Sequence, residues 1–300
     1  MGDSINNGEI ELDDAQPAKS RIGINSSEGA ATSAWQIPTG VSTGTWDYVR
    51  GRRIASEYDQ FLDNDPLTLA DRKILDRYLP AIQYVEPIQK ADVPIVADLG
   101  CGSGWHSIRL AELGYNVLAV DLSLPMLSCL QQKIPGNQPV NHGRLWTLQA
   151  NLVELDAVQT DCLDHAICMF STLGMIHGRR YRKQFLSHVR RIVKPDGQFI
   201  LHVHNIWFQL RHPGGLSWLL SNFMQTLQGK SELGDRFAEY RGIKNMFIHS
   251  FRRRELQRDL RHSGFDQMHW FGIRANETTA VENPNWSSVF QDVGWIVVCR

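Results

Sequence analysis

The sequence lacks any long apolar segment. None of its hydrophobic runs approaches the roughly 20 residues that a membrane-spanning helix needs. The first 20 residues contain acidic side chains in place of the basic start and apolar centre of a secretory signal. We therefore expect a cytoplasmic protein with no membrane partner.

Paired cysteines are also missing. The five cysteines are odd in number, and none of them has C-x-x-C spacing. Small disulfide-rich domains and structural zinc sites depend on such pairs. We therefore expect neither a disulfide framework nor a bound metal.

A strong charge of either sign is absent. The net charge is −1 over 300 residues, which argues against a chain devoted to nucleic acid. However, the first 40 residues hold six acidic and two basic side chains, so the remainder is mildly basic. An RNA substrate therefore stays open as an alternative.

Composition divides the chain into a polar start and an apolar body. Residues 1–40 are rich in Ser, Gly, Asn and acidic side chains and have few large apolar groups, so we predict a disordered tail. Hydrophobic residues make up 42% of the chain, which is enough for a sizeable core in the remainder. Two helical patterns follow the tail, and the strand-like runs begin after residue 92.

The most informative stretch is residues 93–121, VPIVADLGCGSGWHSIRLAELGYNVLAVD. An apolar run of strand type leads into three glycines, a helical pattern begins near Trp105, and a second apolar run ends on Asp121. Glycines at a strand-to-helix turn let a ligand approach the backbone, and the helix start offers unpaired N–H donors. A carboxylate about 20 residues further on can accept hydrogen bonds from both hydroxyls of a ribose. This unit predicts a nucleoside site.

The spacing of the glycines narrows the choice of nucleoside. They are Gly100, Gly102 and Gly104. A dinucleotide fingerprint, G-x-G-x-x-G, needs glycine or alanine where Trp105 or Ser107 stands. With Asp98 in front, the run D-L-G-C-G-S-G instead resembles the first motif of class I S-adenosylmethionine-dependent methyltransferases. Asp121 matches the ribose-binding acid of that family.

This resemblance, which covers residues 93–300, implies a fold and an activity. The fold is a Rossmann-like, doubly wound α/β domain whose seven-stranded sheet has one antiparallel edge strand. The activity is methyl transfer with S-adenosyl-L-methionine as cofactor. The resemblance also implies that residues 41–92 form an N-terminal helical cap. The aromatic-rich residues 206–247, an insertion after the fifth strand, would serve as a lid or acceptor platform, with the packing of an extra subdomain as the alternative.

The resemblance also implies a set of cofactor-binding residues at the ends of the strands. Asn151 stands where the family often has an acid that holds the adenine amino group, and its amide oxygen can accept the same hydrogen bond. Cys101 is interpreted as a small filler of the turn without a catalytic role. The full set is Asp98, Gly100, Cys101, Gly102, Gly104, Asp121, Leu122, Asn151, Leu152 and Phe170.

The acceptor pocket is predicted from the cap and from the chain after the fourth strand. Ligands of doubly wound sheets lie outside the carboxyl ends of the strands, which favours residues near Phe170. Plain packing of the cap on the sheet is the alternative for its tyrosines. The predicted pocket residues are Tyr48, Tyr58, Thr172 and His177.

Methyl transfer places modest demands on the protein. A sulfonium methyl group is already activated, so proximity carries most of the catalysis, and a base is needed only for an acceptor too weakly acidic to ionise. The fifth strand carries His202 and His204 two residues apart, so both point to one face. His204, at the end of the strand, is the first candidate for a base, with a purely structural histidine as the alternative.

Three functions remain after this reasoning. A methyltransferase with a small-molecule acceptor is favoured by the aromatic insertion and the near-neutral charge. A tRNA methyltransferase is supported by basic clusters at residues 50–53, 179–183 and 252–254, although a basic helix face is commonly just solvated. The third function is a nicotinamide-dependent oxidoreductase or a non-catalytic cofactor-binding protein. The acceptor and the oligomeric state stay undecided.

Overall fold

The computed structural model describes five stretches of the chain. They are residues 37–62, 65–83, 93–134, 143–285 and 288–300. The predicted disordered tail lies outside the described residues as far as residue 36. Within the described part, no helix is both long enough and apolar enough to cross a membrane.

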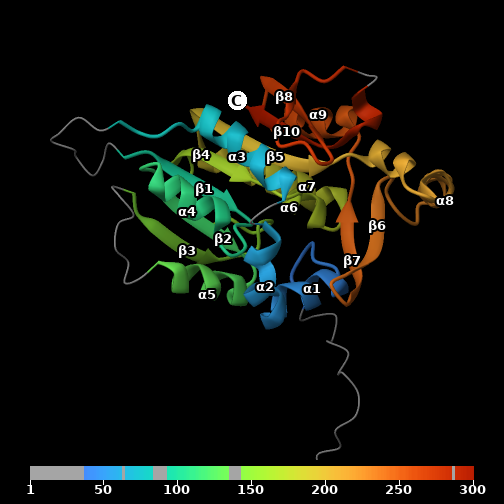
Figure 1. Cartoon of the computed structure of the whole chain (residues 1–300), viewed down its shortest axis with the longest axis horizontal. Helices are drawn as coiled ribbons and strands as arrows, with labels where there is room; N and C mark the ends of the chain where they lie inside the picture. Colours follow the sequence, from blue (N-terminus) through green and yellow to red (C-terminus); the bar gives the residue numbers. More distant parts are fainter. Residues whose placement is uncertain (1–36, 63–64, 84–92, 135–142, 286–287) are drawn as a thin grey trace, which may run out of the picture. The chain divides into compact units, whose positions relative to one another are not determined.

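An eight-stranded sheet forms the centre of the described residues, in the order β3-β2-β1-β4-β5-β10-β8-β9 (Figure 1). Its strands are β1 (Ile95–Leu99), β2 (Asn116–Asp121), β3 (Leu145–Gln149), β4 (Leu163–Cys168), β5 (Val193–His204), β8 (Met268–Arg274), β9 (Val281–Glu282) and β10 (Asp292–Cys299). β1 pairs in parallel with both β2 and β4, and the parallel pairing continues to β3 on one side and β5 on the other. The order of the strands therefore reverses between β1 and β4, which is where doubly wound sheets bind their ligands.

The sheet confirms the doubly wound α/β architecture and corrects two details at its far edge. The antiparallel strand β10 lies between β5 and β8 and is not the edge strand. The edge is instead β9, which has two residues and pairs with Phe271 and Gly272 of β8. The predicted seven strands omit β9 because a two-residue strand has no periodicity to detect.

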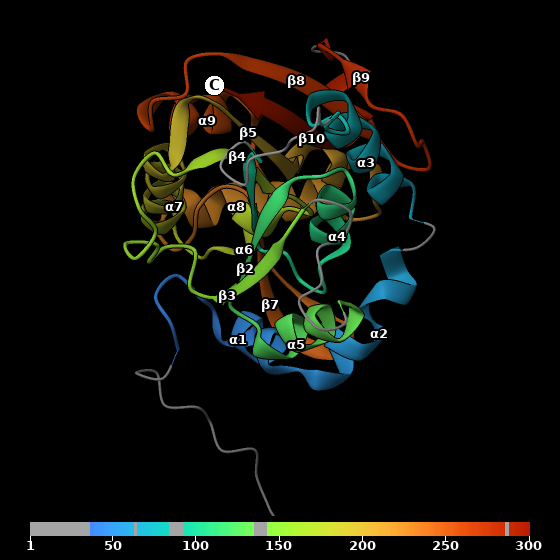
Figure 2. The same ribbon diagram turned by 90° about the vertical axis from the view of Figure 1, so that its left-hand side faces the viewer.

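Both faces of the sheet are covered by helices (Figure 2). The side chains of a strand alternate between faces, so Val96 packs with α3 (Pro66–Tyr78) and α4 (Trp105–Glu112). Ala97 and Leu99 pack on the opposite face with α7 (Arg179–Ile192) and α9 (Arg253–His262). The central strands are apolar on both faces, as expected of buried parallel strands.

Three helices precede the sheet, where the sequence pattern predicted two. α1 (Thr43–Arg50) and α2 (Arg52–Leu62) are separated at Gly51, and α3 follows. The side chain of Asp65 accepts a hydrogen bond from Leu67 N, and Pro66 fits the first turn because that position needs no N–H partner. α1 and α2 both contact α5 (Leu124–Lys133), and Figure 2 shows the three side by side.

The chain leaves the sheet after β5 and returns at α9. This excursion contains the 3₁₀ helix η4 (Ile206–Arg211), the helix α8 (Gly215–Leu227), and a hairpin of β6 (Asp235–Tyr240) and β7 (Ile243–His249). The hairpin forms a separate two-stranded sheet, and β7 packs against α1. The excursion and the N-terminal helices therefore meet although nearly 200 residues separate them in the sequence.

Candidate functional site

The glycine turn after β1 has the strained geometry that its sequence predicts. Gly100 and Gly102 adopt left-handed φ angles of +83° and +53°. A β-carbon at Gly100 would collide with Thr172, which follows β4, so only glycine lets these two segments approach. The amides of Gly100 and Cys101 donate to Val120 O at 2.7 and 3.0 Å, which holds the turn against the end of β2.

Asp121 closes β2 and organises the backbone around it. Its carboxylate accepts hydrogen bonds from Gly102 N at 2.8 Å and from Ser123 N at 2.7 Å. Burial raises the pKa of Asp121, and these backbone hydrogen bonds oppose that shift. The acid thus joins the glycine turn to the start of α5, and its remaining lone pairs are available to a ligand.

A second buried carboxylate lies beside the first. Asp98, at the end of β1, accepts a hydrogen bond from Ser107 Oγ at 2.6 Å. Burial, together with the negative charge of Asp121, raises the pKa of Asp98 to about 7 even though the Ser107 hydrogen bond lowers it. Ionising either of these carboxyl groups costs free energy. The pair therefore favours a cationic ligand, because its charge would offset that cost.

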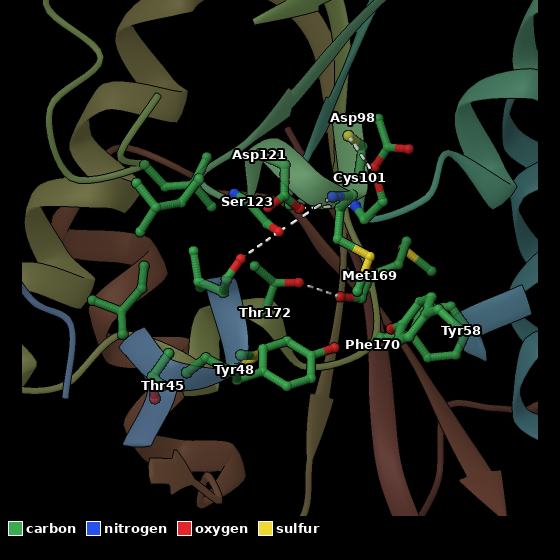
Figure 3. Close-up of a pocket in the computed structure, with 18 of the residues that line it drawn as sticks. Thr45, Tyr48, Tyr58, Asp98, Cys101, Asp121, Ser123, Met169, Phe170 and Thr172 are labelled. Carbon is green, nitrogen blue, oxygen red and sulfur yellow. Dashed lines mark hydrogen bonds between the residues drawn. The ribbon is translucent and has the colours of Figure 1, made fainter. Parts of the chain in front are cut away.

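These groups line a cavity between the strand ends and the N-terminal helices. Figure 3 shows Asp98, Cys101 and Asp121 on one side and Thr45 and Tyr48 on the other. Among its described lining residues there is no lysine or arginine. The predicted residues that line it are Tyr48, Tyr58, Asp98, Gly100, Cys101, Gly102, Asp121, Leu122, Asn151, Leu152, Phe170 and Thr172. We call this space the first cavity.

Three hydrogen bonds fix the N-terminal segment over the first cavity. Ser123 Oγ donates to Val49 O at 2.6 Å, and Ser103 Oγ donates to Asp59 at 2.5 Å. Lys133 also forms an ion pair with Asp59 at 2.6 Å. Asn151 Nδ2 donates to Thr39 O at 2.9 Å. The amide oxygen of Asn151 accepts from other partners, among them Val153 N. The cap is therefore tied to the ends of β1, β2 and β3.

The chain after β4 is strained where it borders the cavity. Phe170 and Ser171 both have left-handed φ angles, +52° and +59°, which cost energy in residues other than glycine. Ser171 N donates to His202 O at 2.9 Å, and its hydroxyl accepts from His204 N at 3.2 Å. β5 thus holds Phe170 in a position where its ring lines the cavity.

A second cavity, of about 490 Å³, adjoins the first. Tyr48, Tyr58 and Phe170 line both spaces. The rest of its wall comes from the end of β5, from η4 and from the hairpin, whose tip places Arg241 over the rings of Tyr58 and Tyr240. Burial raises the pKa of Tyr58 to about 12 and that of Tyr48 well above its usual value, so both phenols stay neutral hydrogen-bond donors.

Comparison with known proteins agrees with this arrangement. Residues 96–197 match the family model described as a methyltransferase domain. The putative methyltransferase YqeM of Bacillus subtilis is 33% identical over 110 residues, which are 37% of this chain and 42% of that protein. A tRNA U34 carboxymethyltransferase of Idiomarina loihiensis is 26% identical over 35% of this chain and 31% of that protein. The chain therefore spans less than half the length of these two curated relatives.

A solved structure extends the likeness beyond the matched segment. The 1,6-didemethyltoxoflavin-N1-methyltransferase of Burkholderia thailandensis, solved with 1,6-didemethyltoxoflavin and S-adenosylhomocysteine, has a TM-score of 0.51 at 18% identity. The match covers 87% of this chain and 90% of that one. Residues 96–197 thus match a methyltransferase domain, and the chain shares its fold with solved S-adenosylmethionine-dependent methyltransferases.

The first cavity of this methyltransferase domain fits S-adenosylmethionine. The cofactor carries a sulfonium and an ammonium group, and the cavity offers two carboxyl groups and no lysine or arginine among its described lining residues. The glycine turn provides the close backbone approach, and Asp121 can accept hydrogen bonds from a ribose. The charge and the backbone geometry of this site thus agree with S-adenosylmethionine as cofactor.

Three predicted residues of the methyltransferase domain occupy other positions. Gly104 lies outside the lining of the first cavity, and a β-carbon there would collide with Leu130 of α5. His177 also lies outside both cavities, with its ring centroid 4.5 Å from that of Phe247. His204 lines the second cavity, where burial lowers its pKa to about 4. A ring with so low a pKa stays neutral at pH 7 but is a weak base.

Sequence reasoning missed the residues that enter from distant segments. Tyr240 and Arg241 are at the hairpin tip, and no motif surrounds them. Asp71 is buried on α3 and bonded to His202, although its helix pattern marked it only as a polar position. His106 directly follows the glycine turn, which was the available signal for placing it at the first cavity.

Proposed function

We propose that this chain is a methyltransferase that transfers the methyl group of S-adenosylmethionine to a small-molecule acceptor. The observation that carries the proposal is the pairing of an acidic cavity at the glycine turn with an adjoining cavity of about 490 Å³, a size typical of small-ligand sites. We assign the cofactor to the first cavity and the acceptor to the second.

The residues at the junction would position the acceptor. The cofactor, when bound, supplies an electrophilic methyl group. Tyr48 and Tyr58 share a hydrogen bond, so one of these phenols would donate to the acceptor, and Phe170 would limit its approach to one direction. Residues 41–92, as a cap, and residues 206–247, as an acceptor platform, would keep water away from the reacting atoms, so that proximity lowers the barrier.

A tRNA acceptor is the second candidate, because one relative acts on tRNA U34 by its name. The basic cluster on α7 gives it little support. Arg179 forms an ion pair with Asp259 at 2.7 Å, and Arg182 is buried and pairs with Glu232 at 2.7 Å. Lys183 also lies 3.8 Å from Asp259, so three of the four cationic side chains in residues 179–183 already have an acidic partner within the protein and are poorly placed to hold phosphate.

Calorimetric titration tests the cofactor assignment. S-adenosylhomocysteine should bind the purified chain in a one-to-one ratio, and NAD should produce no heat. NAD binding without S-adenosylhomocysteine binding would instead support the oxidoreductase.

Release of S-adenosylhomocysteine from S-adenosylmethionine is then measured with a panel of small molecules and with bulk tRNA. Turnover of tRNA alone, weakening steeply as salt rises, would replace the small-molecule proposal.

A further inference from the structure

Three buried polar atoms near the junction of the two cavities have no hydrogen-bond partner among the described residues. They are Asp71 Oδ1, His106 Nε2 and His202 Nε2. Leaving one such atom unpaired costs about 1–3 kcal/mol. A native structure with several of them in one place therefore calls for a functional explanation.

Asp71 and His202 form a direct pair. Asp71 Oδ2 lies 2.9 Å from His202 Nδ1, and both side chains are almost completely buried, at 0% and 1% exposure. With the hydrogen on Nδ1, the carboxylate of Asp71 accepts this hydrogen bond. The neutral ring then has its lone pair on Nε2, which is the atom without a partner.

The pair borders the second cavity, and Nε2 of His202 is buried beside Gly294 of β10. His202 lines the second cavity, and its ring centroid is 6.2 Å from that of Phe170, which lines both cavities. The ring of His106 also stacks on that of Phe170, with 5.6 Å between the two ring centroids. Asp71 belongs to α3, which packs on the same face of the sheet as His202.

The neighbouring His204 lacks these features. Its ring centroid is 6.0 Å from that of His202, and within the described ranges no carboxylate is bonded to it. The proximity of His202 and burial together lower the pKa of His204 to about 4. Of the two histidines on this face, only His202 has a negative partner that can balance a proton arriving at the ring.

We propose, resting on the function proposed above, that His202 accepts a proton from the methyl acceptor through Nε2 and that Asp71 is its positioning residue. The lone pair of the acceptor atom forms the bond to the methyl carbon, and the carbon–sulfur bond breaks with its electron pair on sulfur. The proton of the acceptor atom goes to Nε2. The substrate class is therefore one whose nucleophilic atom bears a proton at neutral pH, such as a phenol, an alcohol or a ring N–H, and not a carboxylate.

Nitrogen NMR of the wild-type chain tests the protonation state without an acceptor. With ¹⁵N-histidine and bound S-adenosylhomocysteine at pH 7.5, His202 should show a protonated Nδ1 and a free Nε2. Asp71→Asn should change this signal while S-adenosylhomocysteine affinity stays within about twofold. A His202 ring protonated on Nε2 in the wild type would overturn the proposal. Failure of S-adenosylhomocysteine to bind would instead refute the proposed function.

Turnover of matched phenols tests the proton transfer. His202→Gln should lower kcat about 100-fold with unsubstituted phenol, in the range of general base catalysis. The loss should be much smaller with 4-nitrophenol, which ionises near neutral pH without help. His204→Gln is the matched control and should lose less than tenfold. Added imidazole should restore part of the activity of His202→Ala. Such a rescue would not occur if the role of His202 were only structural. Equal losses at positions 202 and 204, or turnover of carboxylates alone, would contradict the proposal.

Discussion

The two cavities are built in different ways. The first cavity takes its polar groups from the glycine turn and the ends of β1 to β3, and several of its key contacts involve backbone amides, such as Gly102 N and Ser123 N on Asp121. The second cavity takes its groups from side chains of α2, β5, η4 and the hairpin. The polar groups of the glycine turn and of Asp121 therefore lie within about 25 residues of one another, whereas segments nearly 200 residues apart build the acceptor site.

This difference indicates which of the two cavities can be altered by substitution without disturbing the sheet. Replacing residues of the N-terminal helices or of the excursion alters the second cavity while the sheet stays intact, because these segments form much of its wall. The first cavity is tied to the switch point of the sheet, so changes there disturb the turn itself. Three substitutions sharpen or break this contrast.

Asp121→Ala should have the largest effect, and it should act on the first cavity alone. It removes the acceptor of two backbone hydrogen bonds at 2.8 and 2.7 Å along with the predicted ribose contact. We expect S-adenosylhomocysteine affinity to fall at least about 100-fold by calorimetry, because hydrogen bonds to a charged group contribute about 1.5–3 kcal/mol each. Asp156→Ala, at an exposed position, is the matched control. Unchanged affinity in a folded Asp121→Ala chain would refute the assignment of the cofactor site.

Gly100→Ala should lower the free energy of unfolding more than Gly229→Ala does. Gly100 and Gly229 both have left-handed φ angles, +83° and +69°, but a β-carbon at Gly229 meets no atom within 4 Å, whereas one at Gly100 collides with Thr172. In urea unfolding, we expect Gly229→Ala to cost about 1 kcal/mol from backbone strain. The collision should add about 2 kcal/mol at Gly100. Thr172→Ala should recover part of that extra loss, and equal costs at both glycines would contradict the packing argument.

His249→Gln should have the smallest effect, and it should act on the excursion. The ring of His249 bonds Asp235 at 2.7 Å and Glu255 at 3.1 Å, which joins the base of the hairpin to α9. Although burial lowers the pKa of His249, the two carboxylates outweigh it and raise the pKa, while the ring lowers the pKa of Asp235 and Glu255. The histidine contribution is complete below about pH 6.5 and is lost as pH rises through the raised pKa. The carboxylate contribution is present above about pH 4.5 and is lost as pH falls through the lowered pKa values.

The measurement is the free energy of unfolding of the wild-type and His249→Gln chains at pH 6 and at pH 9. We expect a difference of about 1 kcal/mol at pH 6 that shrinks at pH 9. The affinity for S-adenosylhomocysteine should stay the same, because His249 does not line the first cavity. A difference that grows with pH would show that His249 is held neutral.

Much of the fold followed from local patterns. The run from β1 to Asp121 could be recognised because a buried parallel strand, a glycine turn and a helix are specified by neighbouring residues. The cofactor-site predictions that the structure brings together, among them Asp98 and Asn151, are at strand ends that the strand order places on one edge. Gly104 was predicted from the resemblance and His177 from its position after the fourth strand, and their contacts with Leu130 and Phe247 depend on packing that neither argument describes.

The sequence by itself determined the glycine turn and the acid at position 121, because each depends on backbone geometry over short distances, and the resemblance that they carry implied the doubly wound fold. Only the tertiary structure decided which side chains face an acceptor. Asp71 meets His202 across 131 positions of sequence, and the hairpin tip meets Tyr58 across nearly 200. Such contacts arise from the packing of whole elements, and no local pattern encodes them.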